Sequence, residues 1–96
     1  MDAGIVIPKE AKMKYVERRK KDLEALRSAF AGKDFSEFKK VGHQLKGNSS
    51  TFGFMDLEVI GKELEVAGLA EDVNHAASLL EQFEQWISRT SAAMAE

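Results

Sequence analysis

The sequence contains no cysteine and a single proline, Pro8, among its 96 residues. Without cysteine the chain has no disulfide, no thiolate ligand for a metal ion and no thiol nucleophile. Its 14 basic and 16 acidic residues give a formal net charge of −2, so it lacks the overall basicity of a dedicated nucleic-acid-binding domain. The sequence therefore predicts a folded domain that needs no disulfide and binds no nucleic acid.

Long apolar runs are also missing. No run approaches the ~20 residues that a membrane-spanning helix requires. The first residues contain Asp2 and no basic stretch ahead of the short apolar run at 5–7, and they do not resemble a secretory signal. We expect a cytoplasmic protein without membrane insertion, built as one domain over residues 1–96 with residues 1–7 flexible.

Four segments carry apolar residues at the three- and four-residue spacing of an amphipathic helix, and none shows the alternation of a strand. The expected helices cover residues 8–31, 35–52, 55–68 and 72–94. Short connections favour antiparallel neighbours, so the predicted fold is all-α, an antiparallel up-and-down four-helix bundle with room for a short extra N-terminal helical turn. The side chains expected to face the core from the first, third and fourth helices include Met13, Val16, Leu23, Leu26, Phe30, Leu57, Ile60, Leu64, Ala67, Val73, Ala76, Leu80, Phe83 and Ile87.

Residues typical of helix ends support these limits. Pro8 suits the first turn of a helix. Asp34 is expected to cap the second helix and to form a capping box with Glu37, and Asp56 is expected to begin the third. The glycines placed to end the first three helices are Gly32, Gly53 and Gly68.

The second helix separates an apolar face from a polar one. At ~100° per residue its core-facing stripe consists of Phe38, Val41, Leu45, Ser49 and Phe52. His43 points about 160° away from Leu45, so we expect its imidazole to be exposed. The residues within about 60° of His43 on the same face are Ser36, Lys39, Lys40, Lys46, Gly47 and Ser50.

An exposed histidine is usually only a surface residue, but glycines flank this one. A glycine inside a helix costs roughly 1 kcal/mol relative to alanine. Gly42 could allow close packing against a neighbouring helix. Gly47 lies on the exposed face, which suggests that another protein must come close to the ring. Lys46 reaches the space beside His43 and could stabilise a phosphoryl group on that nucleophilic imidazole.

These residues resemble a known signature. The run His43-Gln44-Leu45-Lys46-Gly47, followed by small or polar residues and then by Phe52-Gly53, closely resembles the motif of the histidine-containing phosphotransfer (HPt) domain family. The resemblance implies that His43 is the phosphorylated histidine, that Lys46 stabilises the phosphoryl group and that Gly47 leaves room for a docking partner. It also implies that Gly53 closes the helix. Lys39, Lys40 and Ser50 complete the expected docking surface.

The same resemblance implies a phosphorelay intermediate in two-component signalling. His43 would accept a phosphoryl group from a receiver aspartate or a kinase and transfer it to another receiver aspartate. The expected partners are response-regulator receiver domains and a sensor or hybrid histidine kinase, and the chain is expected to be a monomer. It would be a phosphocarrier rather than an enzyme and would bind no cofactor or metal, with magnesium expected on the partner receiver.

Two other functions stay open at this point. The chain could be a helical adaptor that docks receiver or kinase domains without phosphotransfer. It could also be an enzyme such as a small hydrolase, although no catalytic triad, carboxylate pair or metal constellation supports this. The basic run at 18–21 is interrupted by acids nearby and is expected to be a solvated face.

The remaining candidate residues are expected to be structural. His75 is the only other histidine, and no lysine–glycine pattern accompanies it. A metal shared between His43 and His75 is a weak hypothesis because two histidines alone make a poor site. We expect the large apolar residues Met13, Phe54, Met55, Phe83 and Trp86 to belong to the core rather than to a cofactor site.

Overall fold

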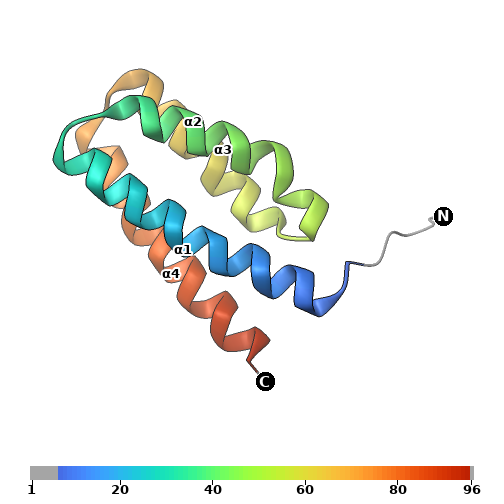
Figure 1. Cartoon of the computed structure of the whole chain (residues 1–96). Helices are drawn as coiled ribbons and strands as arrows, with labels where there is room; N and C mark the ends of the chain where they lie inside the picture. The colour runs from blue at the N-terminus through green and yellow to red at the C-terminus, as the bar shows by residue number, and fades with distance from the viewer. Residues whose placement is uncertain (1–6, 96) are drawn as a thin grey trace.

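The computed structural model describes residues 7–95. Over this part the chain forms α1 (Lys9–Ala31), α2 (Phe35–Asn48), the short 3₁₀ helix η1 (Ser50–Phe52), α3 (Met55–Ala70) and α4 (Val73–Met94), with no strand. Successive helices run in opposite directions, and each packs against two others in a closed ring (Figure 1). The predicted all-α four-helix bundle is therefore confirmed. The extra N-terminal turn and the flexibility proposed for residues 1–7 lie outside the described residues, apart from Ile7, which is not helical.

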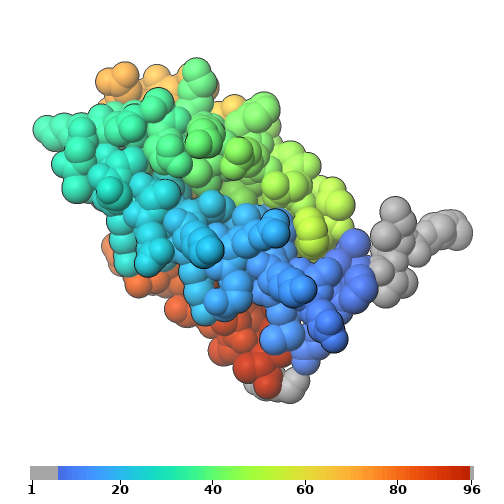
Figure 2. Space-filling view, viewed as in Figure 1, coloured from blue at the N-terminus to red at the C-terminus, as the bar shows by residue number. Residues whose placement is uncertain are grey.

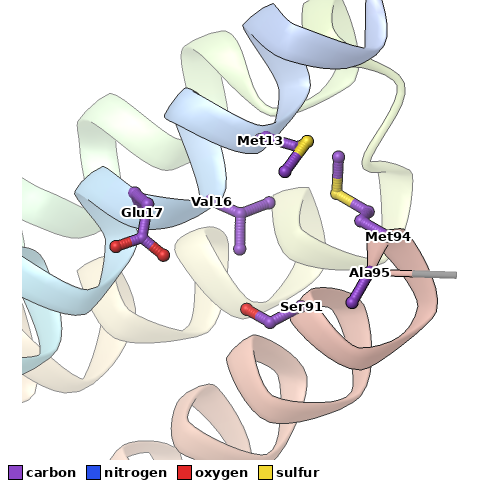
Figure 3. Close-up of a pocket in the computed structure, with 6 residues that line it drawn as sticks. All are labelled: Met13, Val16, Glu17, Ser91, Met94 and Ala95. Carbon is purple, nitrogen blue, oxygen red and sulfur yellow. The ribbon is translucent and has the colours of Figure 1, made fainter.

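The core lies where the apolar stripes of the four helices meet. Phe83 and Trp86 are fully buried, as predicted, and Phe54 packs against this core with its ring edge-on to Trp86. The prediction was wrong for Met13 and Met55, which are 44% and 64% exposed. Met55 is the first residue of α3 and extends beyond the core, and Met13 lines a notch between the start of α1 and the end of α4 (Figure 3).

Val73 was also expected in the core, but it is 45% exposed because it begins α4 at the rim of the bundle. The helices of residues 7–95 include none that is both long enough and apolar enough to cross a bilayer.

The second helix is shorter than the sequence pattern predicts. It ends at Asn48, and the chain continues through η1 to Gly53, whose φ of 86° is in the left-handed region that glycine adopts without steric cost. At the other end Asp34 is the N-cap and accepts a hydrogen bond from the backbone N–H of Ser36 at 3.2 Å. The expected capping box is not formed, because the N–H of Asp34 donates instead to the carbonyl of Ala29 at 2.7 Å.

The end of the third helix also differs from the prediction, whereas its start at Met55 agrees with the expected range of 55–68. Phe54 occupies the N-cap position of α3, and Asp56 lies in the first turn. The helix continues past Gly68 to Ala70 and ends where Glu71 adopts a left-handed φ of 53°. Gly68 instead lies inside α3, where a Cβ on it would come 2.6 Å from the backbone nitrogen of Lys39 in α2.

Glycines bring α2 and α3 into backbone contact. A Cβ placed on Gly42 would lie 2.4 Å from the backbone nitrogen of Glu65. A Cβ on Gly61 or Gly68 would likewise come within 3 Å of the α2 backbone. Gly42 therefore allows close packing against a neighbouring helix, as the sequence suggested. This close packing brings the face of α3 that carries Glu65 directly beside the middle of α2.

Candidate functional site

His43 stands on the outer surface of α2. Its side chain is 71% exposed, whereas Val41 and Leu45 on the opposite face are 3% and 1% exposed. The helical wheel therefore predicted the orientation of the imidazole correctly. In Figure 2 the atoms of α2, in green, form part of the outer surface, and no other segment covers them in that view.

A carboxylate from α3 joins the histidine to the lysine one turn further along α2. Oε2 of Glu65 lies 3.0 Å from Nδ1 of His43, and Oε1 of the same residue lies 2.8 Å from Nζ of Lys46. The Glu65 side chain is only 18% exposed, compared with 42% for Lys46. The three side chains thus form one connected cluster with Glu65 at its base.

The charge state of Glu65 follows from these contacts. The hydrogen bond from Lys46 lowers the pKa of the Glu65 carboxyl, partial burial opposes this, and the hydrogen bond with His43 lowers the pKa further. The net effect is a pKa below the ordinary value of 4.5, so Glu65 is ionised at neutral pH.

An ionised carboxylate can only accept hydrogen bonds. Nδ1 of His43 must therefore carry the proton and donate a hydrogen bond to Glu65. In a neutral imidazole the other nitrogen, Nε2, then holds the lone pair. Within residues 7–95 no protein group binds Nε2, so this nitrogen is free to react with a group that arrives from solvent.

Two further lysines border the same site. His43 and Glu65 line a shallow hollow together with Ser36, Lys39, Lys40 and Gln44. Lys39 and Lys40 are both exposed, and they add positive charge on the side of the ring away from Lys46. An anion that approached His43 would thus find ammonium groups on both sides.

The two other predicted docking residues have different surroundings. Gly47 is exposed, and a Cβ placed on it would meet nothing within 4 Å. Ser50 is exposed as well, but it lies in η1 and not on the face of α2, because the helix ends at Asn48. Gly53 ends η1 and lies against the side chain of Lys12.

Sequence reasoning missed Glu65, although a signal for it was present. Gly61 and Gly68 are one heptad apart on the same face of α3, and Glu65 lies between them on that face. Two glycines at this spacing mark where another helix comes close. A carboxylate between them is therefore placed to reach the side chains of that second helix.

The second histidine has a similar partner but a different setting. Nε2 of His75 lies 3.0 Å from Oε1 of Glu63, and the backbone N–H of His75 donates to the capping Asp72 at 3.1 Å. The side chain is 31% exposed, and no lysine joins the pair. His75 links the start of α4 to α3. No cluster of three metal-ligating side chains occurs anywhere in residues 7–95.

Comparison with known proteins identifies a matching family. The family model described as the Hpt domain matches residues 13–93, a span that reaches from α1 to α4 and includes His43, Lys46 and Glu65. A search of curated proteins and a search of solved structures each returned no match.

Proposed function

This chain belongs to the Hpt domain family, and on that basis we propose that His43 is its phosphoacceptor. Members of the family are phosphocarriers that take part in histidine phosphotransfer in two-component signalling, and they interact with receiver domains and kinases. In this proposal the chain takes a phosphoryl group from a receiver aspartate or a kinase and gives it to another receiver aspartate.

One observation carries the assignment. Glu65 holds the Nδ1 proton of His43 at 3.0 Å while the side chain stays 71% exposed. The ring is therefore fixed in the tautomer whose lone pair is on the solvent-facing Nε2. A neutral imidazole nitrogen with a free lone pair is a competent nucleophile for phosphoryl transfer at neutral pH.

The proposed reaction is an in-line displacement at phosphorus. The lone pair of Nε2 forms the N–P bond, and the bond between phosphorus and the aspartyl oxygen breaks. The aspartate leaves as a carboxylate with the bonding electron pair. His43 keeps its Nδ1 proton and becomes a positively charged phospho-imidazole, and the same steps in reverse load the next receiver.

Both neighbours of His43 match the charges that this product carries. The imidazolium charge develops beside the carboxylate of Glu65, which already accepts its N–H. The phosphoryl group brings about two negative charges. The ammonium of Lys46 has three N–H donors and needs one of them to hold Glu65 at 2.8 Å. The other two remain to bind phosphoryl oxygens.

The partner supplies what this chain lacks. The receiver would bring the phosphorylated aspartate, an acidic pocket and its magnesium ion, while this chain would hold no cofactor of its own. Lys39 and Lys40 would attract that acidic pocket, which quickens encounter more than it tightens the complex. The open space at Gly47 would let the receiver approach the ring.

Phosphotransfer from a labelled receiver tests the proposal. The protein is incubated with a receiver domain that carries radiolabelled aspartyl phosphate, and label on the chain is tested for acid lability and base stability. His43→Gln should abolish the label, and the control His75→Gln should keep it. Label that persists in His43→Gln would reject the site, and binding without any transfer would favour the adaptor function.

A further inference from the structure

A buried tyrosine ties the start of α1 to the end of α2. Tyr15 is 5% exposed and lies beside the link between α2 and α3 (Figure 1). Its hydroxyl donates to Oδ1 of Asn48 at 2.6 Å and lies 3.1 Å from Oγ of Ser49. Because the single phenolic proton goes to Asn48, the fully buried Ser49 donates to the phenol oxygen. These bonds satisfy polar groups that are costly to bury alone.

The phenol ring is itself held in place. The ring of Phe52 stacks on that of Tyr15, with the centroids 4.3 Å apart and 23° between the planes. The guanidinium carbon of Arg19 lies 4.1 Å from the centroid of the Tyr15 ring, within the range of a cation–π contact. Nε of Arg19 lies in turn 2.9 Å from Oδ2 of Asp22. The ring therefore has little freedom to turn, and its hydroxyl occupies a fixed position.

The tyrosine anchors the last turn of α2, and this turn carries Lys46. The N–H of Ser49 closes the turn by donating to the carbonyl of Leu45 at 3.0 Å, and α2 ends at Asn48. Helix ends fray easily because their last carbonyls lack partners within the helix. The bonds from Tyr15 to Asn48 and Ser49 restrain the far end of the turn. They therefore limit the movement of the backbone that carries Lys46.

The position of Lys46 matters because its side chain is long and 42% exposed. A lysine side chain that is free to rotate loses about 2 kcal/mol of rotamer entropy when it is fixed. In the structure its ammonium lies 2.8 Å from Glu65, next to the imidazole of His43. Small displacements of a group that binds a reacting phosphoryl group can lower the rate markedly. A fixed backbone keeps the ammonium within reach of both the carboxylate and the imidazole.

We propose that Tyr15 is a positioning residue for phosphotransfer, whose hydroxyl fixes the last turn of α2 and so holds Lys46 beside His43. The hydrogen bonds of this hydroxyl go to Asn48 and Ser49, so it acts through the backbone and not on the phosphoryl group. The inference rests on the proposed function, because it assumes that Lys46 binds a phosphoryl group on His43. It adds a residue from α1, which the motif around the histidine does not contain.

Removal of the hydroxyl alone tests the proposal. Tyr15→Phe keeps the ring and its stacking, and the control Ile87→Val shortens a buried side chain of α4 without removing a hydrogen bond. Labelling of His43 is followed with phosphoramidate, a small phosphodonor that needs no docking surface. We expect Tyr15→Phe to slow labelling about threefold to tenfold, the range that corresponds to one lost hydrogen bond. Ile87→Val should label at close to the wild-type rate, and a wild-type rate in Tyr15→Phe would overturn the inference.

A double-mutant cycle separates positioning from a general loss of stability. Tyr15→Phe is combined with Lys46→Ala, and the labelling rates of the four proteins are compared. If the hydroxyl acts through Lys46, its removal should change the rate little once the ammonium is gone. An equal slowing in the presence and absence of Lys46 would overturn the positioning role. Should Tyr15→Phe fail to fold by circular dichroism, Asn48→Ala removes the same hydrogen bond from the other side and is expected to give the same result.

A titration that involves no phosphate keeps this inference distinct from the proposed function. The hydrogen bond from Lys46 is the main cause of the lowered pKa of Glu65. In Tyr15→Phe a displaced Lys46 should let the pKa of the Glu65 carboxyl rise toward the ordinary 4.5, as measured by ¹³C NMR, whereas Ile87→Val should leave it unchanged. An unchanged pKa in Tyr15→Phe would contradict the inference. Wild-type protein that takes no label on His43 would refute the proposed function, and the titration would still test the position of Lys46.

Discussion

The carboxylate of Glu65 lies 3.0 Å from Nδ1 of His43, although 22 positions separate the two residues in the sequence. The contact depends on the glycines that bring α2 and α3 together, because a Cβ on Gly42 would collide with the backbone at Glu65. The tautomer of the proposed phosphoacceptor is thus set by the packing of two helices. A close helix contact, rather than the local sequence around the histidine, determines which ring nitrogen is available.

Replacing Glu65 by glutamine tests this role directly. Glu65→Gln keeps the shape but removes the negative charge that holds the Nδ1 proton and would stabilise the phospho-imidazole. We expect the transfer rate to fall about tenfold, equivalent to ~1.4 kcal/mol. ¹⁵N NMR of the imidazole should show a larger share of the tautomer protonated at Nε2.

The matched control is Glu63→Gln, which removes the equivalent carboxylate next to His75 at the same distance of 3.0 Å. It should leave both the transfer rate and the His43 spectrum as in the wild type. Equal effects of the two variants would show that Glu65 acts only through general stability.

The pH dependence of the unfolding free energy should reveal the ionisation of Glu65. The pKa of Glu65 is lowered in the folded protein from the ordinary 4.5, so the unfolded chain binds its proton more readily. Its stabilising effect is therefore fully present above pH ~4.5 and is lost as the pH falls through the folded pKa. We expect the difference in unfolding free energy between wild type and Glu65→Gln to stay level from pH 7 to 5 and to shrink below pH 4. A difference that grows toward low pH would contradict the assigned direction.

The two glycines that flank His43 should respond oppositely to the same substitution. Gly47→Ala adds a Cβ that meets nothing within 4 Å, so better helix propensity should stabilise the protein by about 0.5–1 kcal/mol. Gly42→Ala adds a Cβ only 2.4 Å from the backbone nitrogen of Glu65, and overpacking should destabilise it by about 1–3 kcal/mol. Thermal unfolding of both variants measures the contrast, and shifts of the same sign would argue against the close helix contact.

The lysines beside the ring should act on the rate of encounter. Lys39→Glu with Lys40→Glu reverses two exposed charges in the hollow around His43. We expect slower transfer from an acidic receiver and a weaker dependence of the rate on salt, since the attraction that salt screens is gone. Transfer rates from 50 to 500 mM salt measure this, with Lys14→Glu on α1 as the control. Rates that match the wild type at every salt concentration would contradict a role of Lys39 and Lys40 in electrostatic steering.

Both the fold class and the exposed histidine could be predicted from the sequence, because both follow from helical periodicity. Phe38, Val41 and Leu45 are buried on one face of α2, and His43 is therefore exposed on the other. Periodicity could not predict that α2 would stop at Asn48, since the apolar spacing continues to Phe52 through a 3₁₀ turn. For the same reason the apolar spacing predicts Ser50 on the second helix, whereas it lies in η1.

The residue that completes the site could not be read from the motif around His43. Glu65 comes from another helix, and only the contact between α2 and α3 brings it to the imidazole. The sequence pattern predicts a helix end at Gly68, because glycine often has that role. Its actual position against the α2 backbone appears only in three dimensions. Sequence patterns thus predicted the exposed histidine, and tertiary packing supplied its partner.

Mapping the phosphorylated atom is the most direct test of the central claim. The ¹⁵N-labelled protein is phosphorylated by a receiver domain, and NMR correlation of phosphorus with the ring nitrogens identifies the bonded atom. The account predicts phosphorus on Nε2 of His43, with the proton retained on Nδ1 beside Glu65. Phosphorus on Nδ1 of His43, or on His75, would contradict it.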